Sequence, residues 1–209
     1  MKIKVCGMRN AGNIKAVSEL KPDYMGFIFY PKSSRFVGDD LDAAALKALP
    51  STISKIGVFV NPTHEEVIQK TMRFKLHAIQ LHGNESPAFC KRLSLYVPVI
   101  KAFGVSEDFD FGALNEYESC CSHYLFDTKT PGYGGSGEAF NWELLMHYHG
   151  SKPFFLSGGI GFGHVSKLKM MERELPALYA IDLNSKFETS PGVKDGVKLK
   201  RVMTGLRDV

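Results

Sequence analysis

Eight short apolar runs recur along this chain of 209 residues, with starts roughly 20 to 30 residues apart. They are Ile3–Cys6, Tyr24–Phe29, Lys55–Val60, Ala78–Leu81, Val97–Ala102, His123–Phe126, Pro153–Leu156 and Tyr179–Leu183. The runs are rich in Val, Ile, Phe and Tyr and are nearly continuous rather than alternating. This pattern is typical of strands that are buried on both faces of a parallel sheet.

The segments between these runs carry helix signals. Residues suited to capping a helix precede apolar residues at helical spacing. These caps are Asn10, Asp39–Asp40, Thr63 with Glu66, Ser86 with Pro87, Asn141 and Asp195. Val165, Leu168 and Met171 mark a further helix, and another is expected around Phe109–Tyr117.

Eight strand–helix units in about 200 residues predict an α/β fold, a compact (β/α)8 TIM barrel. We expect a single barrel domain over residues 1–209, because no linker or low-complexity tract interrupts the pattern. The main alternative is a doubly wound open sheet, which normally uses fewer strands and needs a topological switch point.

Composition excludes several classes of function. The chain is 44% hydrophobic and 23% charged, with a net charge of +4, so it reads as an ordinary globular protein. The one approach to a basic cluster, Lys194, Lys198, Lys200 and Arg201, is expected to be the solvated face of a last helix. No nucleic-acid partner is therefore predicted. No apolar run approaches the roughly 18 residues of a membrane span, and no signal-peptide pattern is present, which predicts no membrane partner.

The four cysteines show neither C-x-x-C pairs nor the spacing of a metal site with histidine. Cys6, Cys90, Cys120 and Cys121 are expected to be reduced thiols, which indicates a cytoplasmic protein without a metal ion.

A carboxylate follows the sixth run directly and opens a glycine-rich loop. Asp127 is placed as an acid at a strand end, and glycine fills four of the six positions of 132–137. An acid beneath a mobile lid is one reading, and a turn or capping Asp is the other. The loop also mimics two nucleotide motifs. The G-x-G-x-x-G spacing lacks the direct strand-to-helix turn, and Glu138 stands where a P-loop needs lysine, so neither motif holds.

In a barrel, the side chains at the carboxyl ends of the strands form the active site. These ends carry Cys6, Arg35, His82, Lys101 and Asp127, and a pair of small-residue turns at Gly158–Gly159 and Asn184–Ser185. Small residues after the seventh and eighth strands are suited to binding phosphate through backbone N–H groups. Three of these groups also have an interpretation without a catalytic or binding role: a buried core thiol for Cys6, a surface cation for Arg35 and a structural histidine for His82. The position of Lys101, inside the barrel or at its rim, stays open.

Several blocks, in order along the whole chain, resemble the phosphoribosylanthranilate isomerases of tryptophan biosynthesis. They are KVCGM (4–8), GFIFYPKSSRFV (26–37), IQLHG (79–83), LFDTKTPGYGGSG (125–137), LSGGI (156–160) and the DLNS…E…PGVKD tail (182–195). The resemblance implies that Cys6 is the general base and Asp127 the general acid. It also implies that Arg35 holds the anthranilate carboxylate and that His82 contacts substrate.

The resemblance further implies a phosphate site made of Gly158, Gly159, Asp182 and Ser185. The chain departs from the family pattern at Lys186–Phe187, where Gly-Val is more usual, and at Glu138, where a basic residue is commoner.

The implied activity is the Amadori rearrangement of N-(5-phosphoribosyl)anthranilate, with no cofactor and a phosphorylated small molecule as substrate. A monomer or a homodimer is compatible with the sequence. Two alternatives remain: another phosphosugar isomerase or epimerase on the same barrel, and a non-catalytic barrel that senses phosphate. The other isomerases and epimerases rely on paired carboxylates or metal-binding histidines. A phosphate-sensing barrel has no need of Cys6 and Asp127.

Overall fold

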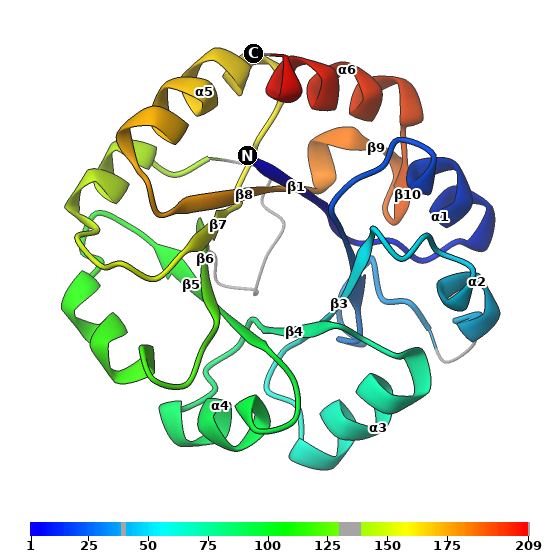
Figure 1. The fold of residues 1–209 in the computed structure, drawn as a ribbon, viewed down its shortest axis with the longest axis horizontal. Helices are drawn as coiled ribbons and strands as arrows, with labels where there is room; N and C mark the ends of the chain where they lie inside the picture. Colours follow the sequence, from blue (N-terminus) through cyan, green and yellow to red (C-terminus); the bar gives the residue numbers. More distant parts are fainter. Residues whose placement is uncertain (39–40, 130–138, 209) are drawn as a thin grey trace.

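A closed barrel of eight parallel strands forms the centre of the molecule. The computed structural model describes residues 1–38, 41–129 and 139–208. The strands follow one another around the ring in chain order, and β8 pairs with β1 through Ile181 and Ile3. Figure 1 shows the strands as an inner ring with the helices outside it. The closed ring confirms the predicted (β/α)8 barrel and excludes the open doubly wound sheet.

The strands coincide with the eight apolar runs of the sequence. They are β1 (Lys2–Val5), β2 (Tyr24–Ile28), β3 (Ser54–Phe59), β4 (Ala78–Leu81), β5 (Val99–Val105), β6 (His123–Thr128), β7 (Phe154–Leu156) and β8 (Leu178–Leu183). The largest difference is at the end of β5, which continues past the predicted run because Val105 pairs with Thr128 of β6.

The helices lie between the strands as predicted, although several are 3-10 helices rather than α-helices. The α-helices are α1 (Ala11–Ser18), α2 (Ala43–Lys47), α3 (His64–Phe74), α4 (Pro87–Ser94), α5 (Val165–Glu174) and α6 (Gly196–Arg207). The 3-10 helices are η1 (Phe111–Tyr117), η2 (Trp142–His147), η3 (Phe162–His164) and η4 (Ser185–Phe187). A small hairpin of β9 (Glu188–Ser190) and β10 (Val193–Lys194) follows η4.

Most of the predicted caps make the hydrogen bonds expected of them. The side chains of Asn10, Thr63 and Ser86 each accept a backbone N–H of the first turn, and so do those of Asn141 and Asp195. The exception is α2, which is capped by the side chain of Asp42. The predicted cap at 39–40 lies outside the described residues. None of the helices that the structure describes is long and apolar enough to span a membrane.

The barrel interior changes from apolar to polar along its axis. A small cluster of Ile56, Ile100, Ala102, Leu125, Phe155 and Ala180 fills one level, separate from the larger core that includes the helices. Side chains alternate between the two faces of a strand, so the inward position after Leu125 belongs to Asp127, and the one after Ala180 belongs to Asp182. Buried charged groups therefore lie directly above the apolar level, towards the carboxyl ends of the strands.

Candidate active site

A cavity of about 300 Å³ opens at the carboxyl ends of the strands. Its walls include Cys6 after β1, Arg35 after β2, His82 after β4 and Asp127 of β6. The four side chains for which the sequence predicted catalysis or substrate binding therefore meet at one pocket. Lys101 is not part of it. The Lys101 ammonium lies outside the pocket, 3.1 Å from Glu85 and within hydrogen-bonding distance of backbone carbonyls at the end of β4.

Cys6 is buried at the inner wall of this pocket, with 4% of its surface exposed. Its backbone N–H donates to the carbonyl of Leu183 in β8, which fixes the strand end that carries the thiol. A Cβ atom at Gly26 of β2 would lie only 2.6 Å from Cys6 Sγ, so glycine is needed there for the thiol to fit. Burial raises the pKa of the Cys6 thiol, and the nearby Lys4 and Lys194 ammonium groups act in the opposite direction.

Asp127 is held from two sides. Its Oδ1 accepts the backbone N–H of Thr128 at 2.8 Å, and its Oδ2 lies 3.3 Å from His82 Nε2. His82 Nδ1 in turn lies 2.7 Å from the side-chain nitrogen of Gln80. His82 therefore contacts the candidate acid directly. Gln80, which the sequence did not single out, joins the pocket because it faces inward two residues before His82.

Gly158 and Gly159 leave β7 in a conformation that favours glycine, with φ values of +89° and +58°. A Cβ atom on Gly158 would lie 2.4 Å from Thr128 Oγ1 and 3.1 Å from Asp127 Oδ1. Glycine thus allows the β7 turn to approach the acid closely. Ser185 follows the neighbouring strand β8 as the first residue of η4, so the two turns predicted for phosphate lie after paired strands.

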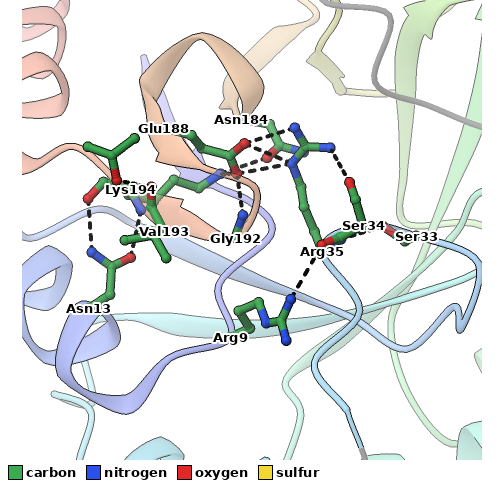
Figure 2. Close-up of polar contacts among 11 residues, drawn as sticks. Arg9, Asn13, Ser33, Ser34, Arg35, Asn184, Glu188, Gly192, Val193 and Lys194 are labelled. Atoms are coloured by element: carbon green, nitrogen blue, oxygen red, sulfur yellow. Dashed lines mark hydrogen bonds and ion pairs between the residues drawn. The ribbon is translucent and has the colours of Figure 1, made fainter.

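The guanidinium of Arg35 is already partly paired within the protein. Glu188 of β9 accepts from Arg35 Nε at 3.0 Å and from Nη2 at 2.8 Å (Figure 2). Among the described residues, Nη1, on the other side of the group, makes one long contact, 3.5 Å to Ser34 Oγ. One edge of the guanidinium is therefore fixed by the protein, and the edge that includes Nη1 is left for a ligand.

Glu188 also binds Lys194, its partner across the hairpin. Lys194 Nζ lies 2.6 Å from Glu188 Oε1 and 2.7 Å from Asn184 Oδ1 (Figure 2). Burial alone would raise the pKa of Glu188, but Arg35 and Lys194 outweigh it and lower that pKa. The prediction that Lys194 belongs to a solvated basic face is wrong, because its side chain is fully buried against this acid.

Asp182, which the resemblance places at the phosphate site, also lines the pocket and is paired with a lysine. Its carboxylate lies inside the barrel, with Oδ2 2.7 Å from Lys4 Nζ, and only 5% of the residue is exposed. The Asp182 carboxylate outweighs the effect of burial and raises the pKa of Lys4, so Lys4 stays cationic. A buried carboxylate already paired with a lysine would repel a phosphate. The geometry therefore argues against the expected phosphate role.

The departure from the family pattern at Lys186–Phe187 is accommodated by packing. Phe187 is 2% exposed and belongs to the main core, while Ser185–Phe187 forms the short turn η4.

One group of possible metal ligands occurs among the residues that the structure describes. The Sγ atoms of Cys90, Cys120 and Cys121 lie within 4.8 Å of one another. None of the three lines the pocket, so they do not contribute to its chemistry.

Ionisable side chains that gather above the carboxyl ends of a closed barrel define a (β/α)8-barrel enzyme. Residues 3–204 match the family model described as N-(5'phosphoribosyl)anthranilate (PRA) isomerase. The chain belongs to this family of isomerases.

Known relatives cover nearly the whole chain. The N-(5'-phosphoribosyl)anthranilate isomerase of Phocaeicola vulgatus is 43% identical over 99% of this chain and 98% of its own length. The crystal structure of phosphoribosyl anthranilate isomerase from Thermotoga maritima superposes with a TM-score of 0.88, at 32% identity, over 100% of both chains. Another crystal structure of a phosphoribosyl anthranilate isomerase superposes with a TM-score of 0.86, at 29% identity and again over 100% of both chains. It is a complex with reduced 1-(o-carboxyphenylamino)-1-deoxyribulose 5-phosphate.

Proposed function

We propose that this chain converts N-(5-phosphoribosyl)anthranilate to 1-(2-carboxyphenylamino)-1-deoxyribulose 5-phosphate. The observation that carries the proposal is the meeting of a thiol, a carboxyl group and a partly free guanidinium around one pocket. The relative that binds a reduced form of this product has the same fold over its whole length. The reaction is an aldose–ketose isomerisation, an intramolecular oxidation and reduction, and the barrel acts as one catalytic domain.

Asp127 is the general acid in this mechanism. It gives a proton to the ring oxygen of the ribose while the C1–O bond breaks, and the electron pair of the anthranilate nitrogen forms the C=N bond of a Schiff base. The contacts from Thr128 N–H and His82 stabilise the carboxylate that remains after the transfer. Both protein contacts use only part of each oxygen's accepting capacity, so a position for the transferable proton is left.

Cys6 is the general base. Its thiolate removes the proton from C2, which the Schiff base has made acidic, and the electrons move to nitrogen to give an enolamine. Loss of the C2 hydroxyl proton and addition of a proton at C1 complete the aminoketone. C2 is oxidised and C1 is reduced, so no external electron acceptor is required. Because burial raises the pKa of Cys6, the reactive thiolate depends on the nearby Lys4 and Lys194.

Binding at both ends places the sugar between acid and base. We assign the anthranilate carboxylate to the free edge of Arg35 and the phosphate to the turns at Gly158–Gly159 and Ser185. Successive backbone N–H groups in such turns attract an anion. Holding both ends supplies the positioning on which a rearrangement of this kind depends. The buried, unpaired thiols suit a reducing compartment, and we expect the enzyme to act in the cytoplasm.

The test is turnover of N-(5-phosphoribosyl)anthranilate by the purified chain, followed by the loss of anthranilate fluorescence. We expect steady turnover without added metal or cofactor. Folded protein that leaves the fluorescence unchanged would refute the proposal. A matched complementation assay asks whether the gene restores tryptophan-free growth to a strain that lacks this isomerase.

A further inference from the structure

A continuous line of polar side chains crosses the barrel interior from the base to the acid. Lys4 Nζ donates to Asp182 Oδ2 and to Gln80 Oε1, both at 2.7 Å, and its charge lowers the pKa of the Cys6 thiol against the effect of burial. Gln80 Nε2 lies 2.7 Å from His82 Nδ1, and His82 Nε2 lies 3.3 Å from Asp127 Oδ2. The line is built from inward-facing residues of β1 and β4 and ends on β6.

The donor and acceptor roles along this line follow from a single starting point. A lysine ammonium can only donate, so the atom of Gln80 that faces Lys4 must be its carbonyl oxygen. The amide nitrogen of Gln80, which also only donates, then faces His82 Nδ1. Nδ1 must therefore accept and carries no proton. The proton of the neutral ring is on Nε2, where it points at Asp127.

We propose that Lys4 and Gln80 are positioning residues that hold His82 as the neutral Nε2–H tautomer and so make it a hydrogen-bond donor to Asp127. The inference rests on the proposed function, in which Asp127 is the general acid. It assigns a role to two buried polar residues that bind no substrate atom in the mechanism above.

The alternative states of His82 show why the tautomer matters. The Nδ1–H tautomer would turn an unprotonated nitrogen towards the lone pairs of the Asp127 carboxylate, leaving that oxygen without its donor. A doubly protonated imidazolium would keep Asp127 ionised and remove the proton that it must give. Only the neutral Nε2–H form leaves Asp127 free to carry a proton and then stabilises the carboxylate once the proton has gone.

Lys4 can determine the orientation of Gln80 because a separate partner, Asp182, keeps Lys4 in its charged form. Asp182 is buried beside it and accepts from Lys4 through Oδ2, while the Gln80 oxygen accepts from the same ammonium. A neutral amine at position 4 could accept a hydrogen bond, and the Gln80 amide could then turn over. The ion pair therefore fixes the orientation of an uncharged amide, and the amide fixes an uncharged ring.

The test measures the His82 ring in the resting enzyme by the ¹⁵N chemical shifts of Nδ1 and Nε2. The His82 signals are identified by their loss in His82→Gln. We expect Nε2 to carry the proton and Nδ1 to be unprotonated in the wild type. Gln80→Glu should reverse this, because a carboxylate oxygen facing Nδ1 accepts a hydrogen bond and so favours a proton on Nδ1, whereas the amide of Gln80 donates one. Its kcat should fall about tenfold or more, within the range of general acid catalysis, with little change in KM.

Gln80→Met is the matched control, since it keeps the length of the side chain but has neither donor nor acceptor at its end. We expect a mixture of tautomers and a kcat between those of the wild type and Gln80→Glu. A wild-type His82 protonated on Nδ1 would overturn the inference. The inference would also be overturned if Gln80→Glu or Gln80→Met kept the wild-type kcat although its chemical shifts show a proton on Nδ1. Because the shifts are read without substrate, they are independent of turnover, whose absence in the wild type would refute the proposed function instead.

Discussion

Two buried lysines flank the same thiol, yet their surroundings differ in charge. Lys4, inside the barrel, faces a single carboxylate, Asp182, and its remaining contacts are uncharged or weakly acidic. Lys194, at the rim, shares the carboxylate of Glu188 with Arg35. The pKa of Lys4 is raised, because Asp182 outweighs the effect of burial, whereas burial lowers the pKa of Lys194 despite Glu188.

The difference separates the region in which we propose proton transfer from the region in which we propose anion binding. One cation and one anion balance each other inside the barrel, so Lys4 can orient neutral groups without attracting a second charge. At the rim two cations share one carboxylate, which leaves a net positive charge beside a partly free guanidinium. A second anion, the carboxylate of the substrate, would complete the balance there.

The largest effect is expected from Asp127→Asn, in the interior region. Asparagine keeps the size and polarity of the side chain but has no proton to transfer. We expect kcat to fall by roughly 10²–10⁴ with a modest change in KM. Steady-state kinetics by anthranilate fluorescence would measure it. If the variant instead had a raised KM and an unchanged kcat, Asp127 would belong to the binding region, and the proposed division of the two regions would be wrong.

Arg35→Lys should produce the opposite kinetic pattern. Lysine retains the charge but loses the two-edged geometry that binds Glu188 and a ligand at once. We expect the affinity for a product analogue to fall about tenfold to a hundredfold, as for loss of a charged hydrogen bond, with inorganic phosphate bound as before. Titration calorimetry with both ligands would test this. Equal loss of both affinities would place Arg35 at the phosphate end.

Removing each anion should cost stability unequally. Asp182→Asn leaves Lys4 charged in the barrel interior, and we expect a loss of about 3–5 kcal/mol. Glu188→Gln leaves buried Lys194 with the Asn184 oxygen as a remaining partner and leaves Arg35 partly exposed, so we expect a smaller loss of about 1–3 kcal/mol. Urea unfolding of both variants provides the comparison. A larger loss for Glu188→Gln would reverse the proposed order.

The rim should also be the more sensitive region to mild acid. The folded-state pKa of Glu188 lies below its ordinary value of 4.5. Its stabilising contribution is therefore present above that value and is lost as pH falls through the folded pKa. Urea midpoints of the wild type should decline across this range more steeply than those of Glu188→Gln. Parallel declines would mean that Glu188 gains nothing from its two partners.

Much of the fold follows from the sequence because strand burial and capping are local signals. Continuous apolar runs indicate buried parallel strands, and Asn10, Thr63 and Ser86 each cap a helix through a bond to its own first turn. The helix predicted around Phe109–Tyr117 is real but is a 3-10 helix. Apolar spacing and capping residues predict a helix but do not distinguish a 3-10 helix from an α-helix.

The site was predictable only where a residue stands at a strand end. Cys6, His82 and Asp127 could be placed in this way, and the pocket brings them together. Gln80 and Lys4 lie within strands, where a polar side chain signals burial but not its partner. Glu188 and Lys194 meet across a hairpin after the eighth strand, so their pairing depends on tertiary structure. The glycine-rich loop predicted as a lid falls mostly in 130–138, outside the described residues.

The most direct measurement concerns Cys6, whose burial would suit an inert core thiol as well as a base. Single-turnover kinetics of Cys6→Ala, compared with the wild type at equal substrate saturation, isolates the chemical step from binding. We predict a rate lower by roughly 10²–10⁴, with the product analogue bound as tightly as before. A Cys6→Ala enzyme that turns over at nearly the wild-type rate would contradict the assignment of Cys6 as the base.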